Sequence, residues 1–170
     1  FHRDILLIRG VKTIPEGFVV DRYNVAGVNN MRGEEIEVFG ILSQLGASWQ
    51  DSELAIFLPG SHTHIVFVRE RAIQDILSTF SGELFQAIAT STLLSCSIDA
   101  HLASFDEEMI CLGFKALQEH GISRALYLVN TMRLFSSMGN REKTSFLEGI
   151  VMGGVVLAFV EKVKQQRSSL

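Results

Sequence analysis

Hydrophobic and polar positions change their pattern near the middle of the chain. Before about residue 80, short apolar runs stand between polar stretches that contain glycine, which is typical of strands and turns. After that point, apolar residues recur at the three- and four-residue spacing of amphipathic helices. Because the strands come early and the helices late, the order predicts a mixed α/β fold rather than a helical bundle.

The first part of the chain predicts short strands, a turn and one helix. The expected elements are strands at 4–9 and 18–20, a turn at 15–17, and a helix from about residue 30 or 31 to residue 45. Asn30 can act as the N-cap of this helix, because its side chain can accept a hydrogen bond from a first-turn amide. Gly46 is a natural stop for it.

A three-stranded meander is expected next. The runs 54–58 and 65–68 are continuously apolar and include β-branched residues, which is typical of strands buried on both faces. Residues 69–71 would turn the chain into a third strand at about 72–77. The connection between the first two strands, 59–64, is unusually polar.

Four helices are predicted in the remainder, at about 82–94, 106–120, 123–138 and 142–164. The second has a capping-box pattern, with Ser104 as the expected cap and Glu107 three residues later. Gly121 would end it. Gly149 and Gly153 are four residues apart on the last helix, and this spacing permits a close helix contact inside the domain.

Composition and charge exclude several classes of function. Of the 170 residues, 47% are hydrophobic, which is ample for a packed core, and the net charge of −4 without a basic stripe argues against a nucleic-acid surface. The apolar run 150–160 is shorter than the roughly 20 residues that cross a bilayer, so we expect a core helix and no membrane association. Cys96 and Cys111 lack metal-type spacing and are expected to be reduced, which favours the cytoplasm.

The first polar cluster is Met31-Arg-Gly-Glu-Glu35, at the start of the first predicted helix. Glu34 and Glu35 would be stabilised there by the helix dipole, and this alone can explain them. Arg32 is less suited to that position. An arginine beside a glycine can bind a planar anion through two hydrogen bonds, so an anion site is the functional interpretation.

The second cluster is Leu58-Pro-Gly-Ser-His-Thr-His64, between two predicted strands. A tight turn with exposed amides and hydroxyl groups can hold a phosphate, although Pro and Gly also occur in ordinary turns. A metal site is a third interpretation, because His62 and His64 would lie on the same face of a strand. It would need a third ligand, for instance Glu83.

The third cluster is Phe80-Ser-Gly-Glu-Leu-Phe85. Ser81 can cap the helix that follows, with Glu83 in its first turn, and capping alone can explain both residues.

Taken in order, the three clusters resemble the 2-dehydro-3-deoxygalactonokinases, and the resemblance extends over nearly the whole chain. That family shows Val-Met-Arg-Gly-Glu-Glu, then Leu-Pro-Gly-Thr-His-Ser/Cys-Lys, then Thr-Gly-Glu-Leu. The apolar helix segment 146–154 also fits. The chain departs from the pattern at His64, where the family has a permanently charged lysine, and at Ser61 and Ser81, where it has threonine.

The resemblance implies part of an actin-like (ribonuclease H-like) kinase lobe, in which a β-meander is followed by several helices. It implies transfer of the ATP γ-phosphate, with Mg²⁺, to the 6-hydroxyl of 2-dehydro-3-deoxy-D-galactonate. Arg32 would contact an anion, and Glu34 would orient or deprotonate the attacking hydroxyl. The other implied contacts are Glu35 and Glu83 to the substrate side and Gly60, Ser61, His62 and Thr63 to the ATP phosphates, with no residue assigned as a metal ligand.

The same resemblance predicts the domain organisation. Residues 1–46 would end the first lobe, and residues 47–170 would form the meander and helices of the second lobe, incomplete at the C-terminus. The family's Asp-Trp-Gly-Thr-Thr-like first phosphate loop and its late Gly-Ser segment have no counterpart in the sequence. We therefore expect a central kinase region that is inactive by itself.

Two alternatives and one question stay open. The chain could be a non-catalytic pseudokinase or sugar-acid-binding remnant, or a metal-dependent hydrolase that uses His62 and His64. The expected partners are a sugar acid and ATP, and the sequence leaves open whether the chain forms a homo-oligomer.

Overall fold

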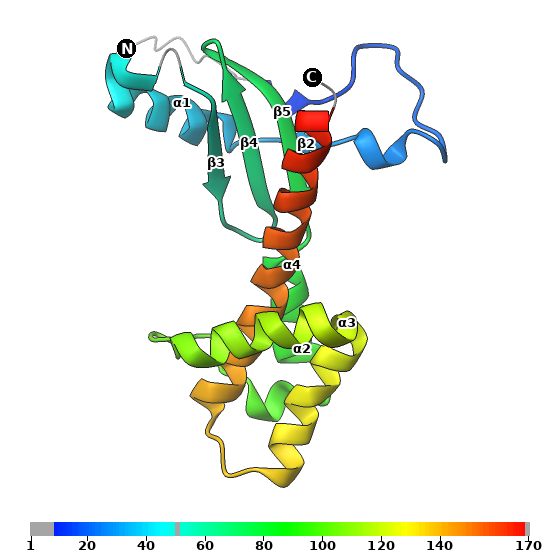
Figure 1. The fold of residues 1–170 in the computed structure, drawn as a ribbon, viewed down its shortest axis with the longest axis vertical. Coiled ribbons are helices and arrows are strands. Elements are labelled where there is room, and N and C mark those ends of the chain that lie inside the picture. The colour runs from blue at the N-terminus through cyan, green and yellow to red at the C-terminus, as the bar shows by residue number, and fades with distance from the viewer. Residues whose placement is uncertain (1–8, 50–51, 169–170) are drawn as a thin grey trace, which may run out of the picture. The chain divides into compact units, whose positions relative to one another are not determined.

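A computed structural model describes residues 9–49 and 52–168. The chain forms two compact units, Phe1–Thr79 and Phe80–Leu170, each with its own hydrophobic core (Figure 1). The strands lie in the first unit and most of the helical residues lie in the second. This order confirms the predicted mixed α/β fold class. Residues 4–8 of the strand predicted at 4–9 lie outside the described residues, and Arg9 is not part of a strand. The predicted lobe boundary after residue 46 stays a prediction.

The first unit begins with a two-stranded antiparallel ribbon. Strand β1, Val11–Lys12, pairs with β2, Asn30–Met31, and the loop between them contains the single-turn 3-10 helix η1, Val25–Gly27. The turn predicted at 15–17 is confirmed, since the amide of Phe18 donates to the carbonyl of Pro15 over 3.3 Å. The strand predicted at 18–20 is wrong. Asp21 accepts the amide of Tyr23 over 2.8 Å, and this Asx turn curls the chain.

Helix α1, Glu35–Leu45, starts later than predicted. Asn30 is not its N-cap but part of β2, where it pairs with Lys12. Gly33 has a φ of 115°, a conformation that glycine adopts without strain, and Glu34 holds the N-cap position. The predicted stop is confirmed, because Gly46 caps α1 at a φ of 63° before the short 3-10 helix η2, Gly46–Trp49.

The predicted meander is present as three antiparallel strands in the order β3-β4-β5. They are β3, Leu54–Leu58, β4, Thr63–Arg69, and β5, Ala72–Thr79. The central strand β4 is buried on both faces along most of its length, as predicted. The same prediction is wrong for β3, because this edge strand alternates and exposes Phe57.

A two-residue turn and a bulge set the register of β4 and β5. Glu70 and Arg71 have φ values of 52° and 64°, and two successive positive φ values are typical of a hairpin turn that matches strand twist. Beyond the turn, Val68 pairs with Ile73 but Phe67 pairs with Asp75, so one extra residue lies in β5. The bulge places Ser78 opposite His64.

One hydrophobic core holds the first unit together. It joins the buried face of α1 to the meander, and Trp49 closes it by donating its indole N–H to the carbonyl of Leu42 over 2.9 Å. Its buried members are Met31, Val38, Leu42, Trp49, Ile56, Leu58, Val66, Val68 and Ile76. Burial of Met31 and Val38 anchors both ends of the Arg32–Glu35 segment.

The second unit consists of helices. They are α2, Gly82–Ser91, the short η3, Ser95–Ser97, α3, Glu107–Phe135, and α4, Asn140–Ser168. The predicted break at Gly121 is confirmed as a kink in α3, with φ 72° and ψ 166°. The predicted Ser104 cap is wrong, because Asp106 is the N-cap and accepts the amide of Met109 over 3.2 Å.

Helices α3 and α4 approach closely through glycine, as the 149/153 spacing predicts. A Cβ on Gly149 would lie 2.0 Å from the carbonyl oxygen of Ile110, and a Cβ on Gly113 would lie 2.1 Å from that of Phe146. Neither position has room for any side chain. The two backbones are therefore in direct contact, with no side-chain layer between them.

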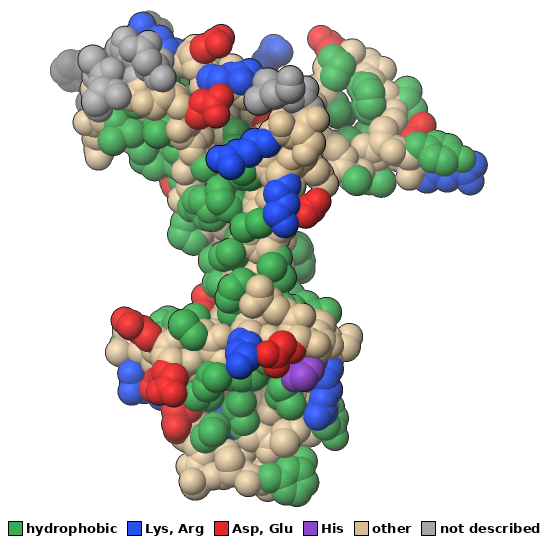
Figure 2. Space-filling view, viewed as in Figure 1, with side chains coloured by type: hydrophobic (Ala, Val, Ile, Leu, Met, Phe, Trp, Pro, Cys, Tyr) green, Lys and Arg blue, Asp and Glu red, His purple; other side chains and the backbone are tan. Residues whose placement is uncertain are grey.

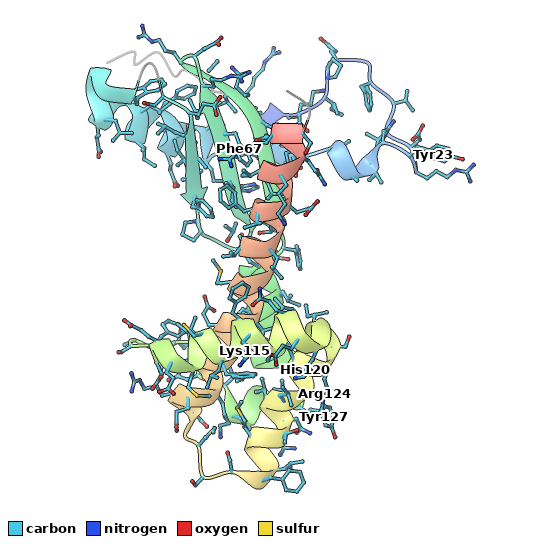
Figure 3. The ribbon with its side chains drawn as sticks, viewed as in Figure 1. Tyr23, Phe67, Lys115, His120, Arg124 and Tyr127 are labelled. Carbon is cyan, nitrogen blue, oxygen red and sulfur yellow. The ribbon has the colours of Figure 1, made fainter. Side chains whose placement is uncertain are left out.

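The outer surface of α3 is polar around the Gly121 kink. Figure 3 labels Lys115, His120, Arg124 and Tyr127 there. Lys115 forms an ion pair with Glu119 at 3.7 Å, and the Nε2 atom of His120 lies 3.8 Å from the same carboxylate. The Arg124 guanidinium lies 5.7 Å from the ring centre of Tyr127. Within the described part of the chain, none of the helices combines the length and apolar character that a membrane crossing requires.

Candidate functional site

The Arg32–Glu35 segment forms a tight turn at the N-terminus of α1. Glu34 accepts the backbone amide of Arg32 over 3.1 Å, and Glu35 accepts that of Gly33 over 2.7 Å. Glu35 is buried, at 2% exposure, so its carboxylate supports the turn from inside. Arg32 is exposed and Glu34 half-exposed. The turn thus presents one cation and one carboxylate beside a helix N-terminus, where negative charge is stabilised.

The predicted phosphate turn connects β3 to β4. Gly60, Ser61 and His62 are exposed, and a Cβ on Gly60 would lie 3.3 Å from the carbonyl oxygen of His62, so the turn folds tightly on itself. Thr63 is the buried first residue of β4, and its carbonyl accepts the hydroxyl of Thr79 over 3.0 Å. The exposed part of the turn therefore comprises the four residues 59–62 before Thr63.

Within the first unit, the Arg32–Glu35 turn meets the start of β4, just after the second turn, at Glu34 and His64. The Nε2 atom of His64 lies 4.0 Å from the Oε1 atom of Glu34. On the other side of the ring, Nδ1 lies 2.9 Å from the hydroxyl oxygen of Ser78, which donates to the carbonyl of Asn30 over 3.1 Å. Clusters that lie some 30 positions apart in the sequence are thus joined by a short chain of polar contacts.

Burial changes the proton affinity of this histidine. Desolvation lowers the pKa of His64 below its ordinary value of 6.5, and the nearby His62 lowers it further, while Glu34 acts in the opposite direction. The net effect is a neutral imidazole at pH 7. A neutral His64 leaves the negative charge of Glu34 intact.

The third cluster lies in the second unit. Ser81 holds the N-cap position of α2 but makes no side-chain capping bond there, which corrects the predicted capping role. Glu83 is exposed in the first turn of α2. The substrate contact predicted for Glu83 stays a prediction.

The metal interpretation lacks a complete ligand set among the residues that the structure describes. The rings of His62 and His64 are 6.3 Å apart, centre to centre. Within residues 9–49 and 52–168, no group of three or more His, Cys, Asp or Glu side chains could hold a metal ion. No third ligand thus joins these two histidines there.

Three residues of this cluster lie outside the sequence motifs, namely Ser78, Asn29 and Asn30. Ser78 connects His64 to β2, and its amide also donates to the side chain of Asn29 over 2.9 Å. Asn29 and Asn30 precede the first motif, so proximity to it could have pointed to them. Ser78 is an ordinary strand residue, and only the register of the meander brings it to His64.

Comparison with known proteins identifies the family. The sequence profile of the 2-keto-3-deoxy-galactonokinases matches residues 7–170. The protein of Rhizobium meliloti (strain 1021) named Probable 2-dehydro-3-deoxygalactonokinase DgoK1 is 35% identical over 68 residues, which cover 40% of this chain and 21% of that protein.

A solved structure gives the same result for the fold. A crystal structure from Sinorhizobium meliloti, whose name assigns it to the 2-dehydro-3-deoxygalactonokinases, superposes with a TM-score of 0.70 at 22% identity. The match covers 89% of this chain and 47% of the solved one, so the chain spans about half the length of that relative. Since the family profile extends over almost every residue, this chain belongs to the 2-keto-3-deoxy-galactonokinase family.

Proposed function

We propose that this chain contributes the substrate cleft and one phosphate-binding turn to a sugar-acid kinase. The reaction is transfer of the ATP γ-phosphate to the 6-hydroxyl of 2-dehydro-3-deoxy-D-galactonate. The observation that carries the proposal is the contact between the two turns, in which Glu34 lies 4.0 Å from His64. This contact supports a single site in which sugar acid and nucleotide phosphates are held side by side.

Arg32 and Glu34 are the residues that we assign to the sugar acid. Arg32 is exposed next to Gly33, and its guanidinium can bind the substrate carboxylate or a phosphate through two hydrogen bonds. The side chain of Glu34 is 36% exposed, so its carboxylate can accept a hydrogen bond from the attacking hydroxyl. This bond orients the hydroxyl and lets the carboxylate accept its proton. Glu35, buried below them, holds the turn that positions both residues.

The turn between β3 and β4 fits the phosphates of a nucleotide. Gly60, Ser61 and His62 are exposed in a tight turn, and such turns direct amides and hydroxyl groups toward an anion. We assign these three residues, with the backbone of Thr63, to ATP. When bound, ATP supplies the phosphoryl group and Mg²⁺ supplies positive charge that offsets its developing negative charge. Glu83 is proposed to steady the loop or the water around the metal.

Catalysis in this site depends mainly on positioning. In-line phosphoryl transfer needs the hydroxyl aligned with phosphorus and the negative charge balanced, and the fixed turns of the first unit can provide both. The 0.70 TM-score to a structure named for this activity supports the arrangement of the elements, while the substrate is inferred from the family.

The deciding experiment uses the full-length protein that contains this chain. ADP release would be measured with a panel of 2-keto-3-deoxy sugar acids, and we expect turnover with the galactonate derivative above the other epimers. If calorimetry detects binding of the sugar acid but no ADP is released, the result supports the hypothesis of a non-catalytic pseudokinase and contradicts the kinase hypothesis. If neither binding nor ADP release occurs, the proposed substrate is wrong.

A further inference from the structure

A chain of hydrogen bonds from Asn30 through Ser78 favours one tautomer of His64. The hydroxyl of Ser78 has a single hydrogen, and it is donated to the carbonyl oxygen of Asn30 over 3.1 Å. Toward His64, 2.9 Å away, the same hydroxyl oxygen can therefore act only as an acceptor. In this arrangement Nδ1 is the N–H donor, and the neutral ring carries its lone pair on Nε2.

The free lone pair of His64 faces Glu34. Nε2 lies 4.0 Å from Oε1, and when the ring is neutral both atoms are acceptors, so no hydrogen bond joins them. One added proton would turn this pair of acceptors into a charge-assisted hydrogen bond. Catalytic hydrogen bonds are often long in unliganded proteins, so the 4.0 Å distance is compatible with a bond that forms on protonation.

The accessibility of the two side chains gives the proton a direction. The side chain of His64 is 7% exposed and that of Glu34 is 36% exposed, so a ligand can reach Glu34 but has little access to the imidazole. A proton that leaves a bound hydroxyl meets the carboxylate first. The imidazole behind it can then take the proton over.

The surroundings of His64 contain few other charges. The groups that face it are Glu34 from the turn before α1, His62 from the turn before β4, and the uncharged Ser78 and Leu58 from the neighbouring strands. Among the described residues, Glu34 is the one carboxylate that acts on the pKa of His64. Glu34 is therefore the group with which His64 can exchange a proton.

We propose that His64 is the proton acceptor behind Glu34. As the sugar hydroxyl forms its bond to the γ-phosphorus and the bond from phosphorus to the ADP oxygen breaks, the hydroxyl proton passes to Glu34 and then to Nε2 of His64. Glu34 regains its negative charge, and the imidazolium remains paired with it until solvent removes the proton. This inference rests on the proposed kinase function, and His64 acts through Glu34 as a positioning residue.

The tautomer can be tested by NMR on the 170-residue chain itself. Long-range ¹H–¹⁵N spectra at pH 7 should show His64 neutral and protonated at Nδ1. Ser78→Thr keeps a hydroxyl and should keep this tautomer, whereas Ser78→Ala should lose the preference for it. The exposed His101 is an internal reference in every spectrum. Wild-type protein with the proton on Nε2 would overturn the proposal.

The role in proton transfer is tested by kinetics on the full-length protein. The acidic limb of kcat/KM against pH should follow protonation of His64, and His64→Gln should remove that limb and lower kcat by about tenfold or more. His101→Gln is the matched control and should change neither kcat nor the acidic limb of kcat/KM against pH. If the wild-type protein phosphorylates the sugar acid and His64→Gln keeps both kcat and this acidic limb, the proton-acceptor role of His64 is wrong. The kinase function then still holds. If no sugar acid is phosphorylated, both fail.

Discussion

Arg32 is the exposed cation of the candidate site, and its contribution can be measured separately from the fold. In the full-length protein, Arg32→Ala should reduce kcat/KM for the sugar acid by about tenfold to a hundredfold, because a hydrogen-bonded ion pair contributes roughly 1.5–3 kcal/mol. Arg22→Ala is the control, since Arg22 lies in the loop between β1 and β2, 4.7 Å from the ring centre of Tyr23. Unchanged kinetics in Arg32→Ala would remove Arg32 from the site.

Glu148 on α4 gives a prediction about pH. Burial raises the pKa of Glu148 above its ordinary 4.5. At pH values between 4.5 and this raised pKa, the folded state therefore binds more protons than the unfolded state. The free energy of unfolding therefore contains a contribution that is fully present below pH 4.5 and is lost as pH rises through the raised pKa. At neutral pH the buried charge weakens the fold.

Glu148→Gln should consequently be more stable than wild type at pH 7, and the difference should shrink toward pH 4.5. Urea denaturation at a series of pH values measures it. Glu161→Gln is the control, because Glu161 is exposed on the same helix. If the stability difference between Glu148→Gln and wild type does not vary with pH, then burial does not raise the pKa of Glu148 in the folded protein.

At the scale of elements, glycine decides how α3 and α4 pack. Gly149→Ala would place a methyl group 2.0 Å from the carbonyl of Ile110, and overpacking of this kind costs about 1–3 kcal/mol or more. Gly154→Ala is the matched control, since nothing lies within 4 Å of its Cβ position on the same helix. It should gain about 0.5–1 kcal/mol from helix propensity. Thermal unfolding would compare the two variants, and equal stabilities would contradict the close contact.

Local patterns predicted the long and strongly apolar elements well. The run 54–58 matches β3 at both ends, and the stops at Gly46 and Gly121 are correct. These features depend on residues that are neighbours in the chain. The start of α1 was missed because Asn30 and Met31 pair with β1, and the sequence around residue 30 carries no information about that partner.

In the candidate site too, local sequence patterns do not predict contacts with residues far away in the chain. The two motifs that meet in the first unit were visible in the sequence, including Arg32, Glu34 and His62. Ser78 was not, because its place opposite His64 depends on the bulge in β5. Without the bulge, the pairing of Val68 with Ile73 would continue and bring Leu77 to His64 instead. One extra residue therefore decides whether a hydroxyl or an apolar side chain contacts the imidazole.

For the whole molecule, the sequence predicts weak nucleotide binding. The family resemblance implies that ATP is held between two phosphate loops, and we propose that the turn at Gly60–Thr63 is the second of them, while no counterpart of the first was recognised in the sequence. Calorimetry of this chain with ATP and Mg²⁺ should show no binding in the low-micromolar range, and the full-length protein is the control. Low-micromolar affinity of the chain itself would mean that the turn at Gly60–Thr63 binds ATP without the first loop.

The surface of the first unit carries one conspicuous apolar region. Figure 2 shows hydrophobic side chains gathered on the loop between β1 and β2, and Tyr23 lies at its tip in Figure 3. The exposed large hydrophobic residues of this loop are Phe18, Val19, Val20, Tyr23 and Val25, with Tyr23 at 81%. The base of the loop is closed at Thr13, whose hydroxyl accepts the amide of Asn29 over 2.8 Å. Its ends are thus fixed even though its apolar tip faces solvent.

The glycine contact between α3 and α4 also limits how these helices can move. Where side chains separate two helices, rotamer changes let one helix slide along the other. At Gly113 and Gly149 backbone meets backbone, so no side chain at this contact can change its rotamer to accommodate a shift of either helix. The contact therefore holds the register of the two helices at this point.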